Sequence, residues 1–313
     1  MLRRIAGSLF WAARYLERAQ WRARLVDVNY HLLLEVPPRD LEPWEPLVRI
    51  TAEQELFATK HTHATEASVI DFFVFDQENP SSIRSCIDSV RANLSPLRHL
   101  ISSELWVAVN RLYLETQGWS AQTLAAAGVS AFFAELQRHF YTIEGIIVNT
   151  MPRDLTYDLF ALGTMLERPD NVSRLLDVKY HYLLPRLEDI GGPADLRQWA
   201  AVLRSASAFE AFRKTYGNAI QVNRVVEILV FDPSFPRSMR FSIDQTAEAL
   251  GRIASREGEP APETQPCAEL LAMLHGGSAT TTIESGLHEF LIGVEAGCAR
   301  LSDHVFDRYM SLE

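Results

Sequence analysis

The chain has 313 residues, of which 47% are hydrophobic, and this is enough to build one large domain or two ordinary ones. Its formal net charge of -10 and the lack of a basic tail argue against nucleic acid as a partner. Three scattered cysteines without CxxC spacing suit a reduced compartment, so we expect a cytoplasmic protein without a redox centre.

The first predicted element is a helix over residues 2–35, in which apolar residues recur every three or four positions. Its basic, apolar beginning is interrupted by Arg14, Glu17 and Arg18, and no cleavage pattern follows. No apolar run in the chain reaches the ~18 residues of a membrane helix. We therefore expect neither a secretory signal nor a membrane-embedded protein.

Helices are predicted along the rest of the chain as well, because the same spacing dominates and alternating strand patterns are nearly absent. Breaks fall at Gly and Pro. They leave further helical segments at 43–60, 65–75, 81–116 and 130–150, and a similar series follows. The sequence therefore predicts an all-α fold, a helical bundle.

The second series of segments repeats the first. Residues 16–34 match 166–184 at an offset of 150, with 11 identities in 19 positions. Residues 40–49 recur at 195–204, and 74–88 recur at 230–244, at offsets of 155 and 156. Three blocks in the same order predict an internal duplication, with a first repeat at 1–151 and a second at 152–313.

The two repeats are expected to pack about a pseudo-two-fold axis into a single domain over 1–313. Each half alone would leave its repeated apolar face uncovered. The alternative is two independent domains joined by a linker. The sequence near residue 151 contains neither a long loop nor a low-complexity segment that could serve as such a linker.

Charged residues recur in both copies at heptad spacing, which places them almost above one another on a helix. We call each such set a column, and the two columns are Phe10, Glu17, Arg24 and His31, and Phe160, Glu167, Arg174 and His181. Both lie within or beside an apolar stripe. A solvated helix face would not need to repeat them in this order.

Two interpretations of the columns remain open. In the structural one, Glu17 and Arg24 with their copies form a buried ion-pair ladder where the two long helices meet. In the functional one, the pseudo-two-fold axis brings the carboxylates, arginines and imidazoles to one cleft that holds an acidic or phosphorylated ligand. Glu17 and Glu167 are then the catalytic candidates, and the binding candidates are Arg18, Arg24, His31, Arg168, Arg174 and His181.

A second duplicated set consists of Asp76, Arg84 and Asp88 and their copies Asp232, Arg240 and Asp244. Arg84 and Arg240 are kept as further binding candidates. The plainer interpretation is a local ion pair four residues apart on a helix, with Asp76 serving the turn before it.

Self-sufficient catalytic motifs are missing from the sequence. It has no nucleophile elbow, phosphate-binding glycine loop or Ser-His-Asp order. Neither column has the Glu-x-x-His spacing of a di-metal bundle site. We therefore expect no metal and no cofactor, and we lean against an enzyme.

Several segments together resemble the Alpha-E family of bacterial helical domains, which is named for a Glu-Arg motif. They are "LFWAARYLERAQWRARLVDVNYHLLLE", "ENPSSIRSCIDSVRANLSPLRHLISSELWVAVNRLYL", "NTMPRD", "LGTMLERPDNVSRLLDVKYHYLL" and "FDPSFPRSMRFSI". The resemblance spans essentially the whole chain, and the motif falls on Glu17-Arg18 and Glu167-Arg168.

The resemblance implies partners. Such domains are typically encoded beside or fused to a circularly permuted ATP-grasp protein and a transglutaminase-like peptidase. These neighbours imply a system that makes or attaches short peptides through amide bonds, with this chain as an accessory binding subunit. An enzyme with its own Glu/Arg/His site and a pure scaffold are the alternatives.

One residue departs from the family pattern. The first copy reads Glu-Arg-Ala, but the second reads Glu167-Arg168-Pro169. Proline inside a helix removes a hydrogen bond and disfavours helical geometry at the residue before it. We therefore expect a kink or a restart near Arg168, with the second Glu-Arg pair departing from the first.

Overall fold

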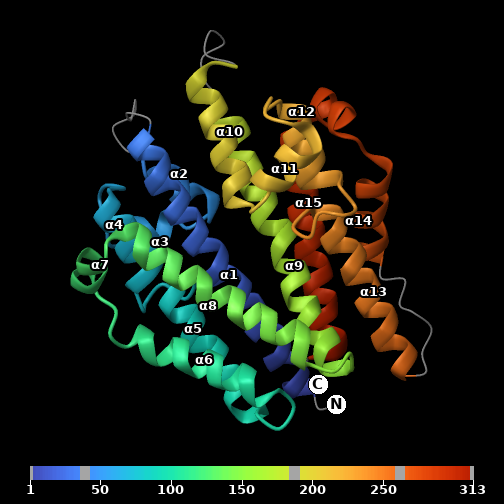
Figure 1. Cartoon of the computed structure of the whole chain (residues 1–313). Helices are drawn as coiled ribbons and strands as arrows, with labels where there is room; N and C mark the ends of the chain where they lie inside the picture. Colours follow the sequence, from blue (N-terminus) through green and yellow to red (C-terminus); the bar gives the residue numbers. More distant parts are fainter. Residues whose placement is uncertain (1–2, 36–42, 183–190, 258–264, 311–313) are drawn as a thin grey trace.

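The computed structural model describes residues 3–35, 43–182, 191–257 and 265–310, and these fold into helices without a strand (Figure 1). The all-α prediction is confirmed, since 81% of the structure is helical. Its first ten elements are α1 (Arg3–Glu35), α2 (Glu45–Ile50), α3 (Gln54–Ala58), α4 (Glu66–Ile70), η1 (Asp71–Phe75), α5 (Ile83–Leu94), η2 (Ser95–Leu97), α6 (Ser103–Thr116), α7 (Ala121–Ala127) and α8 (Val129–Thr150).

The second part of the chain follows with α9 (Leu155–Asp177), η3 (Val178–Tyr182), α10 (Pro193–Ser205), α11 (Phe209–Tyr216), α12 (Val222–Val226), η5 (Glu227–Phe231), α13 (Met239–Glu257), α14 (Gln265–Gly276) and α15 (Ala279–Tyr309). Three of the short elements, η1, η3 and η5, are π-helical, and η2 is a 3-10 turn.

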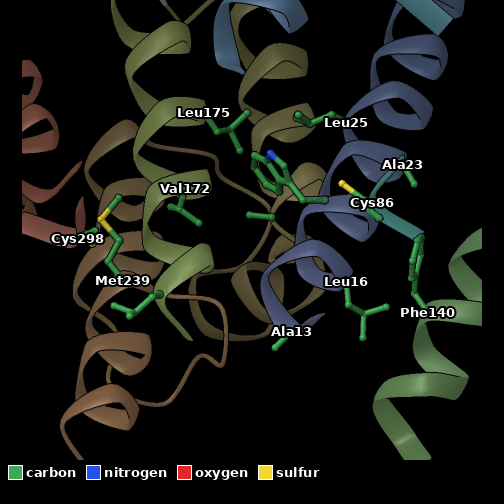
Figure 2. Packing of buried hydrophobic residues seen from close by; sticks show 14 of the residues in the cluster. Ala13, Leu16, Ala23, Leu25, Cys86, Phe140, Val172, Leu175, Met239 and Cys298 are labelled. Carbon is green, nitrogen blue, oxygen red and sulfur yellow. The ribbon is translucent and has the colours of Figure 1, made fainter. Parts of the chain in front are cut away.

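Two long helices, α1 and α9, lie next to each other in the middle of the molecule (Figure 1). Helices α5 and α8 pack against α1, while α13 and α15 pack against α9. In the close view of the core, Cys86 of α5 and Phe140 of α8 lie on the α1 side, and Met239 of α13 and Cys298 of α15 on the α9 side (Figure 2). The apolar stripes of both long helices are thereby covered on each flank.

The closest approach of α1 and α9 requires a glycine. A Cβ atom at Gly163 would lie 2.3 Å from the carbonyl oxygen of Phe10 and 2.9 Å from the Cβ of Ala13. Such distances are well inside van der Waals contact, so a larger residue here would force the helices apart. Ala13 is fully buried at the same crossing.

Most of the predicted segments are helical, but several of them are divided into two or more helices that are shorter than the predicted ones. The helices predicted at 2–35 and 130–150 are confirmed as α1 and α8. The segment at 81–116 is broken between α5 and α6, where the 3-10 turn contains Pro96. Proline lacks an N–H donor and restricts the residue before it, which explains the interruption.

Of the two effects expected of Pro169, a kink or a restart, the restart does not occur. Helix α9 continues through Pro169 from Leu155 to Asp177. One missing N–H bond is tolerated because Pro169 is itself buried and α9 is packed along its length by α1, α13 and α15. A real departure from helical geometry occurs elsewhere, at Gly286 in α15, with φ +118°.

No helix among the described ranges combines the length and the apolar character needed to cross a membrane. The three cysteines are free and buried.

Candidate functional site

The two Glu-Arg dipeptides face each other across the contact between α1 and α9. Arg18 Nε lies 2.6 Å from Glu167 Oε1, and Arg168 Nε lies 3.1 Å from Glu17 Oε2. Each motif therefore supplies an arginine to the glutamate of the other. We call these two contacts the reciprocal pair.

Each glutamate is held by a second arginine as well. Arg14 Nε lies 2.7 Å from Glu167 Oε2, and Arg237, just before α13, donates to Glu17. Both cations of Glu17 come from residues after 151, and both cations of Glu167 come from residues before it. The reciprocal pair thus joins the two parts of the chain.

The two carboxylates are buried, with only 3% of each side chain exposed. Burial by itself raises the pKa of Glu17, but the charges of Arg168, Arg237 and Arg24 outweigh it and lower the pKa to about 2. Burial likewise raises the pKa of Glu167, and Arg14 and Arg18 reverse the effect, so that the net shift is downward. Both groups are ionised at neutral pH.

Buried ion pairs form where the two long helices meet, but the arginines that contact the glutamates are not Arg24 and Arg174 of the predicted ladder. A spacing of seven residues is about 10.5 Å along a helix, whereas side chains three or four positions apart meet. Arg174 accordingly pairs with Asp170, at 3.0 Å, and approaches Glu295 of α15 at 3.7 Å. Arg24 points toward Gln137 of α8, at 3.5 Å.

The remaining predicted site residues lie apart from the reciprocal pair. His31 is exposed near the end of α1, where its Nδ1 is 2.8 Å from the Asp27 carbonyl and its Nε2 is 3.1 Å from Ser130 Oγ. The side chain of His181 lies outside the described residues. The predicted set of carboxylates, arginines and imidazoles is therefore not gathered at one place by the described side chains.

Arg84 and Arg240 belong to the α5 and α13 helix starts. Arg84 donates two hydrogen bonds, at 2.8 and 2.9 Å, to the side-chain oxygen of Gln77 when the amide of Gln77 is oriented with its oxygen toward Arg84. Arg240 approaches Asp244 at 3.9 Å, a long contact of the predicted four-residue kind. The turn role predicted for Asp76 is confirmed, since its carboxylate accepts the backbone N–H of Glu78.

A polar fringe surrounds Glu17 on the side of α8. Glu144 of α8 lies 3.4 Å from both Arg168 and Arg237 and accepts a hydrogen bond from Gln20 at 3.2 Å. Arg237 Nη2 also donates to Gln20 Oε1, at 2.9 Å. This fringe reaches the surface, because 30% of the Glu144 side chain is exposed.

Sequence reasoning missed Arg14, Arg237, Gln20 and Glu144. Arg14 lies one turn before Arg18, on the same face, and this spacing could have identified it. Arg237 stands in the repeated block at 230–244, but its counterpart in the first block is Ser81, so the repeat did not mark it. Nothing in the sequence indicates that α8 contributes Glu144.

Two surface pockets lie away from these residues. One, of about 420 Å³, is lined on α6 by residues that include Val107 and Leu114, and the other, of about 460 Å³, lies along α13 near Arg252 and Arg256. Within the described ranges, no group of three His, Cys, Asp or Glu side chains is arranged to hold a metal ion.

A family model described as a predicted alpha-helical domain with a conserved ER motif matches residues 1–310. The chain belongs to the Alpha-E family. Glu-Arg dipeptides occur in this chain at Glu17-Arg18 and Glu167-Arg168, the residues of the reciprocal pair.

Relatives of this Alpha-E chain are longer proteins. It is similar to uncharacterised protein Rv2567 of Mycobacterium tuberculosis and to uncharacterised protein Mb2597 of Mycobacterium bovis, at 22% identity over 279 residues in each case. The match covers 83% of this chain but 31% of each relative. The chain thus spans about a third of the length of these relatives, and no solved structure matches it.

Proposed function

We propose that this Alpha-E chain is a binding subunit without a catalytic centre of its own. Its partner in this proposal is a circularly permuted ATP-grasp protein of an amide-bond-forming system, with a transglutaminase-like peptidase as a possible second partner. The chain would dock the ligase and orient a peptide-like substrate. A cytoplasmic setting is part of the proposal and is supported by the buried free thiols.

The single observation that carries the proposal is the state of the two motif glutamates. Each is buried and held ionised by two arginines from the other part of the chain. A general acid needs a pKa near the working pH, and a carboxyl with a pKa of about 2 is a poor proton donor at neutrality. The motif therefore favours assembly of the bundle over acid-base chemistry.

The length of the relatives supports a role beside other domains. In both mycobacterial proteins the matched region is about a third of the chain. A domain that occurs within a longer protein is suited to act on or through its neighbours, which is what a docking subunit does.

We also propose that residues 1–151 and 152–313 are two copies of one unit that form a single domain. The succession of an α-helical turn and a π-helix at 66–75 recurs at 222–231, at the same offset of 156 as the sequence block. Gly128 before α8 and Gly286 within α15 both have positive φ, at +83° and +118°. These correspondences and the reciprocal pair favour the duplication.

The docking proposal is tested with the purified proteins. We expect this chain to co-purify with a circularly permuted ATP-grasp protein encoded beside it and to increase the rate of that ligase on a peptide substrate. The matched control is the same ligase assay with the chain heat-denatured before addition. A ligase that neither binds the chain nor changes its rate would rule out the proposal.

A further inference from the structure

The polar fringe beside Glu17 holds more positive than negative charge. Arg24 lies close to Glu17, next to Arg168 and Arg237 of this fringe, and among the described residues the carboxylates that contact these arginines are Glu17 and Glu144. The local sum of these five groups is therefore one positive charge, in a chain whose net charge is -10. A buried group of cations that is one anion short is costly unless something balances it.

The imbalance is concentrated at Arg24. Only 6% of this residue is exposed, and its Nη1 has no hydrogen-bond partner although it is buried. Its Nη2 makes a long contact with Gln137, at 3.5 Å, and the Tyr141 hydroxyl lies near the same guanidinium. Burial and the nearby Arg237 lower the pKa of the Arg24 guanidinium to about 10, which still leaves it charged at neutral pH. Buried donors of a charged group normally have acceptors.

The corresponding position in the second part of the chain is satisfied. Arg174 occupies the place of Arg24 at the offset of 150, and it donates two hydrogen bonds to Asp170, both at 3.0 Å. Beside Glu167, the second donor of Arg14 is used by Ser302 of α15, at 2.5 Å. The unfilled donor is thus a feature of the Glu17 side.

We propose that this Alpha-E chain binds one monoanionic carboxylate at the Glu17 side of the core, with Nη1 of Arg24 as the principal donor. Gln137 and Tyr141, both on α8, border the site. The carboxylate would belong to the peptide-like substrate that the docking subunit orients, and this assignment of the ligand rests on the proposed function.

The chemistry of the surroundings favours a carboxylate. One negative charge completes the local balance, whereas a dianionic phosphate would exceed it. Guanidinium groups match the planar carboxylate in shape and direction. Glu144 is an example of a carboxylate bound by these arginines, since its partly exposed side chain lies 3.4 Å from both Arg168 and Arg237.

Access is from the surface of α8. Tyr141 is 53% exposed, and its hydroxyl lies close enough to Arg24 to favour the charged guanidinium. Because Nη1 is buried, a ligand reaches it only when neighbouring side chains turn aside, and the neighbours of this guanidinium on α8 are Gln137 and Tyr141. An exposed tyrosine changes rotamer on the nanosecond timescale, so this opening is fast.

The test measures binding by the full chain alone, without any ligase, by isothermal titration calorimetry in a low-chloride buffer at pH 8, where inorganic phosphate is mainly dianionic. The probes are acetyl-alanine, its C-terminal amide, acetyl-aspartate amide and inorganic phosphate. Acetyl-alanine presents a terminal carboxylate and acetyl-aspartate amide a side-chain carboxylate, so the two separate a peptide end from an acidic side chain as the source.

We expect one molecule of at least one carboxylate probe to bind, while the amide does not. Arg24→Gln should weaken binding at least tenfold, and the matched control Arg174→Gln should leave it unchanged. Tyr141→Phe and Gln137→Ala, which alter the exposed border, should each change the affinity severalfold in a chain whose circular dichroism is that of the wild type.

The inference is overturned if no carboxylate probe binds, if the amide or phosphate binds as tightly, or if Arg24→Gln binds like the wild type. Should Arg24→Gln fail to fold, the Tyr141 and Gln137 variants decide in its place. If the carboxylate binds but the ligase does not dock, the result counts against the proposed function alone. If the ligase docks but no carboxylate binds, the result counts against this inference alone.

Discussion

Arg18 of α1 and Glu167 of α9 are 149 residues apart in sequence and 2.6 Å apart in space. The same relationship holds in reverse for Arg168 and Glu17, which are 151 residues apart, so buried charges link distant parts of the chain twice over. Buried ion pairs contribute little net stability but are expensive to break from one side, and the consequences can be measured.

Removing one charge of the reciprocal pair should destabilise the fold strongly. Glu17→Gln leaves Arg168 and Arg237 without their buried carboxylate, and we expect a loss of about 3 to 5 kcal/mol in the free energy of unfolding. Urea denaturation followed by circular dichroism measures it. The control is Glu78→Gln, which removes an 84% exposed partner of Lys60 and should cost about 0.5 kcal/mol or less. An equally small loss at Glu17 would mean that the pair is not structural.

The helix crossing at Gly163 gives a second prediction. Gly163→Ala places a methyl group against Phe10 and Ala13, and we expect it to destabilise the protein by about 1 to 3 kcal/mol through overpacking. Gly145, inside α8, has no atom within 4 Å of such a methyl group, so Gly145→Ala should stabilise by about 0.5 to 1 kcal/mol. Thermal unfolding of both variants compares them, and two shifts of the same sign would contradict the close crossing.

Stability should fall in acid partly through Glu17. Its pKa is lowered from 4.5 to about 2 in the folded protein, so its contribution is complete above the unfolded value and is lost as the pH falls from 4.5 through about 2. Protonated Glu17 resembles glutamine. The stability gap between wild type and Glu17→Gln should therefore narrow by about 1.4 kcal/mol between pH 7 and pH 3.5, one unit below 4.5. A gap that stays constant in urea titrations across this range would disprove the assignment.

Arg24 should behave unlike the arginines that contact the two motif glutamates. Its burial is uncompensated at Nη1, so Arg24→Met removes a cost while keeping most of the side-chain volume. We expect the free energy of unfolding to change by less than about 1 kcal/mol or to rise. Arg168→Met should instead lose about 3 to 5 kcal/mol, because it strands Glu17. Similar losses in both variants, measured by denaturant unfolding, would show that Arg24 is already balanced in the free protein.

Much of the fold could be predicted from periodicity. The spacing of apolar residues predicted α1 and α8 and placed Glu17 and Glu167 where two long helices meet, and both lie in that contact. A pattern of period 3.6 tells which face of a helix is buried. It does not tell how far one helix is turned or shifted against the next.

That missing quantity explains the errors at the site. Which arginines of the other helix reach Glu17 depends on the depth of the crossing at Gly163, which is set by the volumes of side chains far away in sequence. Arg237 and Glu144 come from separate elements, and only the tertiary arrangement brings them to Glu17. The helix restart expected at Pro169 does not occur for a similar reason, since tertiary packing outweighs a local preference.

The dependence of each glutamate on cations from the other half makes the halves mutually obligatory. A fragment ending near residue 151 would bury Glu17 with neither of its arginines, and the remaining fragment would do the same to Glu167. Neither piece could persist alone, yet two identical copies of one piece could satisfy each other by exchanging arginines. In the proposed duplication, the ancestor would therefore have been a homodimer, and joining its subunits in one gene allowed Glu144 and Ser302 to diverge on opposite sides of a once symmetric core.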